Sequence, residues 1–212
     1  MRRILLLLPL IIALTVCLAH AGNASQAGNA AADRFFALAE KGSPDDVRRF
    51  LNAHPGLDRG SITKALHISA MSNSKEVLQL FINAGGDIGY KYSSFEGSEG
   101  GEEGDICSSF AATPFSDAAS SGKYENASLL LQYGANVNDT ACSGSGEVSI
   151  LHYAAQMGKL DLIKFLMSKG ADPKIKDQNN HTPCQEAKNP SNGAIYDKKQ
   201  VDEMLKMMKY CK

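Results

Sequence analysis

Histidine and cysteine are the residues of this sequence whose chemistry could serve a metal site or a nucleophile–base pair. His181 and Cys184 stand three residues apart in the stretch His-Thr-Pro-Cys, but no second Cys/His pair follows at the spacing of a zinc finger. The G-x-S-x-G, H-E-x-x-H and P-loop patterns are also absent from the sequence. We therefore predict a protein that is not an enzyme, with no catalytic residues, no metal ligands and no cofactor.

An acidic segment before Thr113 is the most individual feature of the sequence. Residues 91–110 read KYSSFEGSEGGEEGDICSSF. Carboxylates are ligands that calcium prefers, but the acids here lack the spacing of an EF-hand loop. Two interpretations stay open: a mobile, solvated loop of Gly, Ser and Glu, or a binding loop whose aromatic side chains anchor a partner. The aromatic candidates are Tyr90, Tyr92, Phe95 and Phe110.

The first 21 residues have the pattern of a secretory signal peptide. Arg2 and Arg3 precede an apolar run, and Ala-His-Ala before Gly22 is typical of a cleavage site, so cleavage is expected between Ala21 and Gly22. The apolar run is shorter than the about 20 residues that a spanning helix needs. We expect a periplasmic or secreted protein that has no membrane contact after cleavage, with a flexible leader over residues 22–31.

The charge balance of the chain is mild. Removing Arg2 and Arg3 with the signal leaves 20 of the 22 basic residues, against 23 acidic ones, so the net charge becomes −3 with histidine neutral. Nucleic acids and anionic membranes attract strongly basic surfaces. This composition therefore argues against nucleic acid as a partner.

A 12-residue interval recurs along the chain. It separates Gly42 from His54, Asn73 from Gly85, Gly122 from Gly134, and Gly158 from Gly170. Each unit reads as a short helix, a glycine or asparagine, a longer apolar helix and a second polar or glycine stop. Helices this short do not persist alone in water. Each unit must therefore bury its apolar face against a neighbouring copy.

Short openings precede these intervals: TPFSDAA from Thr113, SILHYAA from Ser149, and TPCQEA from Thr182. They resemble the T-P-L-H-x-A opening of ankyrin repeats, whose period is about 33 residues. Ser149 and Thr182 are 33 residues apart. The resemblance implies an all-α ankyrin-repeat solenoid of about five helix-turn-helix units, with divergent terminal caps and one long finger-loop insertion. The implied domain covers residues 32–212, with units at about 32–58, 62–90, 111–140, 147–177 and 180–211, and the insertion at 91–110.

Several positions have structural roles in such a repeat. Gly122 and Gly158 are expected to end the first helix of their units in a left-handed conformation. Asn73 is expected to do the same in its unit, because asparagine tolerates a positive φ. His67 and His152 occupy the fourth position of the opening, and the resemblance implies hydrogen bonds from these rings that join neighbouring turns.

The mature chain has four cysteines, and export permits disulfides. Stacking of repeats would place Cys107 and Cys142 side by side, because they hold nearly equivalent loop positions in adjacent units. Cys184 begins the first helix of the last unit and Cys211 follows its second, and antiparallel helices bring these points together. We predict the pairs Cys107–Cys142 and Cys184–Cys211, with four free thiols as the alternative.

Ankyrin proteins typically bind other proteins, and they seldom catalyse. By resemblance, we expect a periplasmic or extracellular module that binds a protein partner through its concave face and finger loops. The candidate contacts on the first helices are Asp117, Ser120, Tyr153 and Gln156, together with the aromatic residues of the insertion. Two alternatives remain: an accessory, protective or inhibitory (immunity-like) protein for a periplasmic enzyme, and calcium-dependent binding through the acidic loop.

Overall fold

A computed structural model of the chain describes residues 31–93, 111–143, 146–190, 193–209 and 211. The predicted signal peptide with its Ala21–Gly22 cleavage site, most of the leader and the acidic segment lie outside the described residues. Phe95, Cys107 and Phe110 belong to that segment, as do the acids considered for calcium. Predictions that rest on them stay predictions.

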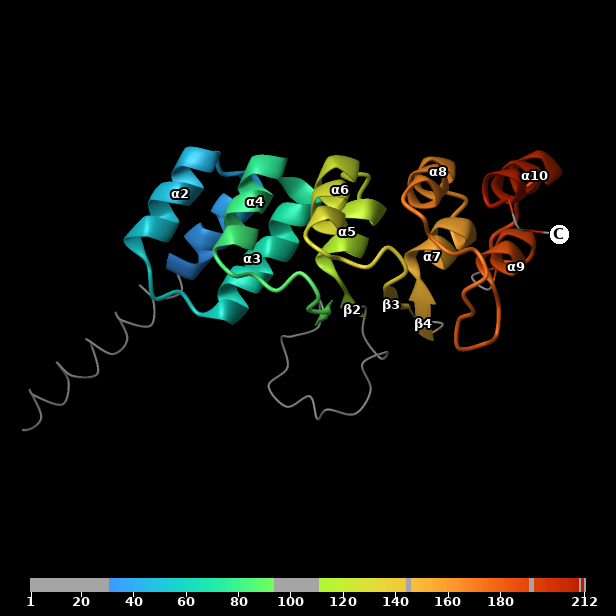
Figure 1. Ribbon diagram of the computed structural model, residues 1–212, viewed down its shortest axis with the longest axis horizontal. Coiled ribbons are helices and arrows are strands. Elements are labelled where there is room, and N and C mark those ends of the chain that lie inside the picture. The colour runs from blue at the N-terminus through green and yellow to red at the C-terminus, as the bar shows by residue number, and fades with distance from the viewer. Residues whose placement is uncertain (1–30, 94–110, 144–145, 191–192, 210, 212) are drawn as a thin grey trace, which may run out of the picture.

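Within the described residues, helices form five antiparallel pairs that stand in a row (Figure 1). The pairs are 31–41 with α2 (Pro44–Ala53), α3 (Arg59–Ser72) with α4 (Lys75–Asn83), α5 (Pro114–Ser120) with α6 (Tyr124–Gln132), α7 (Ile150–Gln156) with α8 (Leu160–Ser168), and α9 (Pro183–Lys188) with α10 (Lys198–Met207). Helices α3, α5, α7 and α9 contact one another in sequence, and we call them the inner row. Helices α2, α4, α6, α8 and α10 form the outer row. The mostly helical solenoid predicted from the sequence is confirmed.

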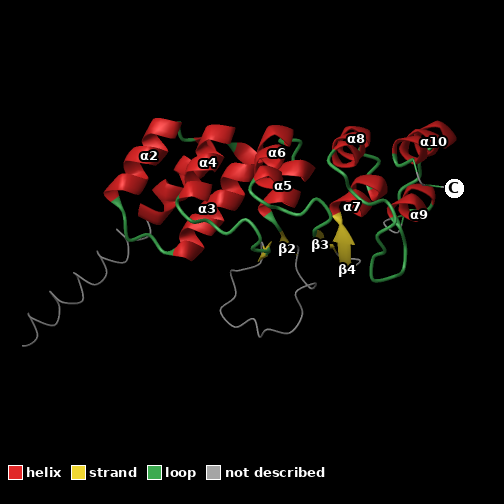
Figure 2. Cartoon of the chain, viewed as in Figure 1, coloured by secondary structure: helices red, strands yellow, loops and turns green. Residues whose placement is uncertain are grey.

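Two short antiparallel strand pairs, coloured yellow in Figure 2, extend beneath the inner row. Strand β1 (Tyr92–Ser93) pairs with β2 (Ala111–Ala112), and β3 (Thr140–Ser143) pairs with β4 (Gly146–Ser149). Strands β2 and β3 contact each other, so the two fingers lie side by side. The all-α fold expected from the sequence did not include these strands. The strands form because the two segments of each pair run antiparallel, so their backbone N–H and C=O groups satisfy one another.

Polar caps begin the short helices of the inner row. The side chains of Thr113, Ser149 and Thr182 each accept a hydrogen bond from a backbone N–H one turn into their helices. These caps satisfy donors that lack a partner within the helix. A helix of seven residues, such as α5 or α7, has few internal hydrogen bonds, so its cap is a large part of its local stability.

Small residues allow the inner helices to approach closely. Ala118, Ala119, Ala154 and Ala155 are all fully buried, as the repeat pattern predicts. Larger side chains such as Leu66 fill the space between the two rows. The buried residues form one cluster that runs from Phe35 to Met208. Neighbouring units therefore share one continuous core.

In the turns between paired helices, glycine and asparagine adopt different backbone conformations. Gly122 and Gly158 have φ values of 75° and 61°, which is the left-handed region expected for them. The expectation for Asn73 is wrong, because its φ is −100° and its backbone is extended. Asn73 instead directs its side-chain amide at the carbonyls of Leu38, Ala39 and Gly42, at distances of 3.1–3.3 Å.

That contact is one example of a device that recurs between units: a side chain of one unit donates to carbonyl oxygens at the end of the first helix of the preceding unit. The donors are Asn73 toward residues 38–42, Asn126 toward α3, Lys159 toward α5, and Tyr196 toward α7. Carbonyls at a helix end have no partner within the helix. These bonds therefore stabilise the stacking of units as well as the helix ends.

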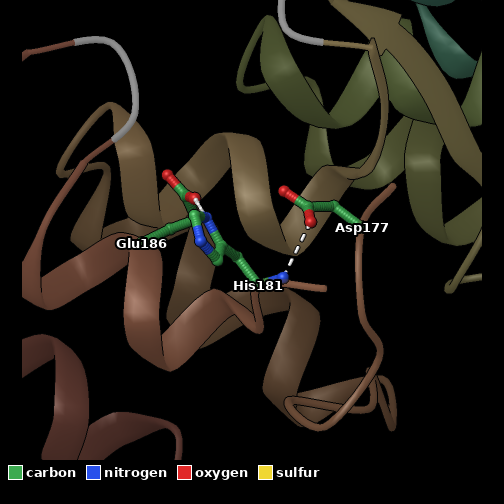
Figure 3. A group of neighbouring side chains, drawn as sticks. All are labelled: Asp177, His181 and Glu186. Atoms are coloured by element: carbon green, nitrogen blue, oxygen red, sulfur yellow. Dashed lines mark hydrogen bonds and ion pairs between the residues drawn. The ribbon is translucent and has the colours of Figure 1, made fainter. Parts of the chain in front are cut away.

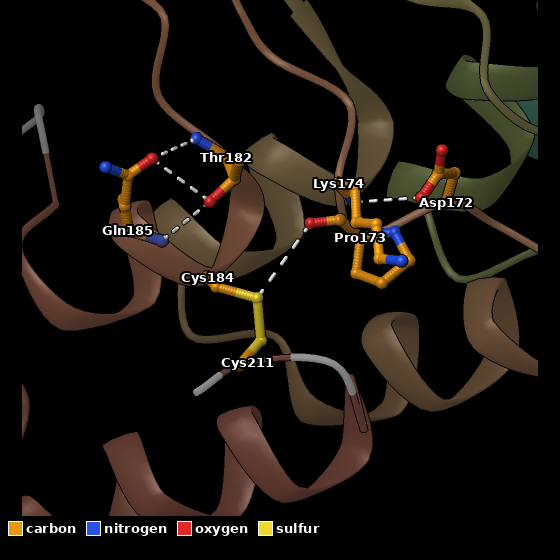
Figure 4. The surroundings of a disulfide bond; sticks show 7 residues. All are labelled: Asp172, Pro173, Lys174, Thr182, Cys184, Gln185 and Cys211. Atoms are coloured by element: carbon orange, nitrogen blue, oxygen red, sulfur yellow. Dashed lines mark hydrogen bonds between the residues drawn. A yellow bond between two sulfur atoms is a disulfide. The ribbon is translucent and has the colours of Figure 1, made fainter.

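A disulfide joins the two ends of the last helix pair (Figure 4). The Cα atoms of Cys184 and Cys211 are 5.5 Å apart, and the bond closes a separation of 27 residues. This bond is compatible with the pairing predicted from the sequence. Met204 and Met208 of the same unit are fully buried. The last unit is therefore closed internally by a covalent bond and also contributes side chains to the common core.

Candidate partner-binding surface

The inner row and the two strand pairs form the surface on which the sequence-predicted contacts fall (Figure 1). Asp117 and Ser120 lie on α5, and Tyr153 and Gln156 lie on α7. Tyr92 lies in β1, near the finger end of the same surface. We refer to this side of the molecule as the inner surface.

Asp117 is held by a histidine of the preceding unit. Its Oδ2 lies 2.8 Å from Nδ1 of His67, and Nε2 of His67 lies 3.1 Å from the carbonyl oxygen of Tyr90. His67 is buried, while the Asp117 side chain is 20% exposed. The ring thus joins α3, α5 and the segment leading into β1. Asp117 presents only one edge of its carboxylate to a partner.

Ser120 and Tyr153 share a lysine. The Nζ of Lys159 donates to the carbonyl oxygen of Ser120 and to the Tyr153 hydroxyl, both at 3.1 Å. The same ammonium lies 4.9 Å from the centre of the Tyr153 ring. A cation is stabilised at the C-terminal end of a helix and over an aromatic face. The three half-buried residues form an ordered polar patch on the inner surface.

The prediction that Gln156 faces outward is wrong. Gln156 is 4% exposed, and its Nε2 donates to Oε2 of Glu186 at 3.0 Å. The cause is the neighbouring unit, because the carboxylate on α9 draws the amide into the interface between α7 and α9. An amide buried between two units is not accessible to a binding protein.

The inner helices also expose two apolar residues that were not among the predicted contacts. Met71 is 40% exposed and Met157 is 48% exposed. In the repeat frame Met71 aligns with Ser120, and Met157 aligns with Ser121. The frame predicts exposure of Met71, because Ser120 was itself a candidate contact. It gives no such signal for Met157, because Ser121 was not a candidate.

Tyr90 borders a hollow at the N-terminal part of the inner surface. Tyr90 is 43% exposed, and the hollow has a volume of about 510 Å³. Its lining includes the ring of Phe36, which lies beneath the ammonium of Lys64 at 4.8 Å. An ion pair between Arg59 and Asp87, 3.2 Å apart, lies at its edge. The hollow combines an apolar floor with charged walls.

The comparison with known proteins decides the family. The sequence model described as "Ankyrin repeats (3 copies)" matches residues 35–141 and 99–177, which together make up more than half of the chain. The chain belongs to the ankyrin-repeat family. Its last helix pair lies beyond the matched residues.

A 124-residue segment of this ankyrin-repeat chain is 32% identical to the B-cell lymphoma 3 protein homolog of Mus musculus. The match covers 58% of the chain but only 24% of that relative. The chain therefore spans about a quarter of the relative's length. Ankyrin repeats are protein–protein interaction modules, and the family is typically non-catalytic. Among the described residues, no helix has the length and apolar character needed to cross a membrane.

His152 joins the two last ankyrin units and is fully buried. Its Nδ1 lies 2.7 Å from the Ser149 hydroxyl, and its Nε2 lies 2.9 Å from the carbonyl oxygen of His181. Burial lowers the pKa of His152 below its ordinary value of 6.5, although the His181 carbonyl and nearby carboxylates oppose this effect. The folded chain therefore favours the neutral ring.

We expect the free energy of unfolding to decrease as the pH falls below about 6.5. There the unfolded chain binds a proton at His152 that the folded chain resists, and stability decreases when the unfolded state binds more protons. His152→Gln should remove this part of the pH dependence. Urea unfolding of both proteins at pH 7.5 and pH 5.5 measures it. An equal loss of stability in the two proteins would contradict the expectation.

Proposed function

We propose that this chain is an exported ankyrin-repeat module that binds a protein partner through its inner surface. The observation that carries the proposal is the set of exposed apolar side chains on that surface, Met71, Tyr90 and Met157, at 40–48% exposure. Tyrosine and methionine are enriched in protein interfaces relative to the rest of the surface. Tyr90 stands just before β1, and Met71 and Met157 stand at the C-terminal ends of α3 and α7, on a scaffold that the continuous core keeps rigid.

Charged and polar groups on the same surface would fix the orientation of a bound partner. Lys64 lies at the hollow beside Tyr90, and Lys159 lies beside Tyr153. Both ammonium groups are positioned over aromatic rings. A partner that inserts an apolar side chain into the hollow would find an ammonium beside it. Such a mixed patch, apolar at the centre and charged around it, is the usual composition of a specific interface.

The proposed location is the periplasm or the extracellular space. The supporting observation is the arginine-led apolar run of the first 21 residues with its Ala-His-Ala ending. The disulfide between Cys184 and Cys211 agrees with an oxidising compartment. Fractionation of cells that produce the chain, followed by N-terminal sequencing, tests both the compartment and the cleavage after Ala21.

Two tyrosines provide a matched test of the binding surface. Tyr90 lies on the inner surface at 43% exposure, whereas Tyr133 lies on the outer row at 45% exposure, bonded to Gln79 of α4. We expect Tyr90→Ala to weaken binding of a partner captured from the exported fraction by about tenfold or more, which is the effect of a central interface residue. Tyr133→Ala should leave the affinity unchanged.

The measurement is the dissociation constant of the purified partner for the wild-type chain and each variant. Hydrogen exchange of the complex gives an independent readout, with slower exchange expected in α3, α5 and α7 than in the outer row. Equal affinities of the Tyr90 and Tyr133 variants, together with protection of the outer helices, would move the binding surface to the other side of the molecule.

A further inference from the structure

Three side chains that could hold a metal ion meet in the last unit (Figure 3). Asp177 belongs to the turn before α9, His181 lies at the end of that turn, and Glu186 lies within α9. Each offers one ligand atom, and these atoms lie within 4.8 Å of one another. One imidazole nitrogen and two carboxylate oxygens make up the donor set.

The backbone of the turn holds two of these residues together. The Oδ1 of Asp177 accepts hydrogen bonds from the N–H groups of Asn179 and His181, both at 2.8 Å. The N–H of Asp177 donates to the carbonyl oxygen of His181 at 2.9 Å. Asn180 closes the turn with a φ of 63°. The positions of Asp177 and His181 are therefore set by the fold, independently of any ligand.

The second oxygen of Asp177 is the feature that suggests a cation ligand. Asp177 is only 8% exposed, and among the described residues no group forms a hydrogen bond with its buried Oδ2. Figure 3 shows this oxygen directed toward the side chains of His181 and Glu186. A buried carboxylate oxygen without a partner is costly, and each such group in a folded protein calls for an explanation.

Glu186 is oriented from the neighbouring unit. It is fully buried, its Oε1 lies 3.0 Å from Nδ1 of His181, and its Oε2 accepts from Gln156 at 3.0 Å. Outer groups that orient a ligating carboxylate are typical of metal sites. The His181 side chain is 46% exposed, so an ion has a path from solvent to the cluster.

The ankyrin frame does not require these side chains. Val148 and Ala112 occupy the position of His181 in the two preceding units. Tyr153 and Asp117 occupy the position of Glu186. The pairing of His181 with Glu186 is thus particular to the last unit.

We propose that Asp177, His181 and Glu186 bind a divalent zinc ion. Zinc takes imidazole nitrogen and carboxylate oxygen at about 2.0–2.2 Å, with water completing a tetrahedral set. Ligand atoms around such an ion lie about 3.3 Å apart by that geometry, close to the 3.0 Å between His181 and Glu186. The nitrogen ligand favours zinc over calcium, which prefers oxygen alone.

Binding requires Nδ1 of His181 to be free of its proton. A neutral ring with its proton on Nδ1 would adopt the Nε2–H tautomer, with no net release of a proton. An imidazolium form releases one proton to solvent instead. The ion would join the turn before α9 to α9 itself, and through Gln156 it would couple both to α7.

The test is zinc chloride titration of the full mature chain, purified without a histidine tag and with its disulfide intact. We expect saturable binding of one ion and a rise in the unfolding temperature. Asp177→Asn and Glu186→Gln should each weaken zinc binding at least tenfold. Asp117→Asn is the matched control, because it removes the carboxylate from another His–carboxylate pair, and it should bind zinc as the wild type does.

Cobalt supplies a readout that is independent of stability. The wild-type chain with Co²⁺ should show visible absorption from nitrogen and oxygen ligation, without the charge-transfer band of thiolate ligands, before and after thiol alkylation. Circular dichroism verifies that each variant is folded. The proposal is overturned if the wild type binds no zinc, if folded Asp177→Asn and Glu186→Gln bind it with unchanged affinity, or if the cobalt band is that of a thiolate.

Discussion

Replacing Cys184 and Cys211 by serine should lower the free energy of unfolding of the last unit by about 3.5 kcal/mol. The disulfide closes a separation of 27 residues, and the loop-entropy model assigns about that stabilisation to a loop of this length. The effect is large for this chain because the last unit has a neighbour on one side only. Its helices α9 and α10 pack on α7 and α8, and nothing among the described residues covers their outer side.

Denaturant unfolding with and without reductant measures the contribution. Reductant should lower the stability of the wild-type chain to that of the double variant or below it. In the double variant, reductant should cause no loss of stability from this bond, because the variant lacks both thiols. Peptide mapping without reduction locates the bond directly. A double variant as stable as the oxidised wild type, or free thiols at both positions in the folded chain, would contradict the prediction.

Asn126→Leu should destabilise the chain by about 2–3 kcal/mol, although leucine is close to asparagine in size and is more apolar. Asn126 is 3% exposed on α6, and its Nδ2 lies 3.0 Å from the carbonyl oxygen of Asn73 and 3.1 Å from that of Ala70. Leucine would leave these carbonyls at the end of α3 buried without their donor. The cost of an unsatisfied buried polar group is about 1–3 kcal/mol.

Asn83→Leu is the matched control, because Asn83 is also helical but is exposed on α4. Its effect should lie within about 0.5 kcal/mol, as for most surface substitutions. Urea unfolding of the two variants under one set of conditions gives the comparison. If both variants lost equal stability, the amide of Asn126 would have no special role at the junction of the second and third units.

These predictions describe a molecule whose units depend on their neighbours for both apolar burial and helix capping. The donors Asn73, Asn126, Lys159 and Tyr196 all reach backward by one unit. A binding surface that spans several units requires them to keep a constant spacing. The inter-unit hydrogen bonds and the shared core supply that spacing, and the exposed methionines and Tyr90 lie on the resulting rigid face.

Much of this architecture was determined by the sequence alone, because the repeat imposes the same local chemistry at each copy. Thr113, Ser149 and Thr182, the first residues of the repeat openings, begin helices in the structure, since a hydroxyl at a helix start needs only a backbone N–H in its own helix. Gly122 and Gly158 have the predicted positive φ for an equally local reason, since glycine lacks a Cβ atom. The pairing of Cys184 with Cys211 followed from the antiparallel geometry of one helix pair.

Only the tertiary structure decided the roles of polar residues at the junctions between units. Asn73 has no positive φ because the carbonyls of the preceding helix offer its amide better partners. Gln156 is buried because Glu186 of the next unit accepts a hydrogen bond from its side-chain amide. The spacing of Asp177, His181 and Glu186 in the sequence did not predict that an Asp177 carboxylate oxygen is directed toward the other two side chains. A repeat pattern specifies what each unit does internally, whereas the orientation of a buried polar side chain at a junction depends on atoms outside its own helix, mostly atoms that a neighbouring unit supplies.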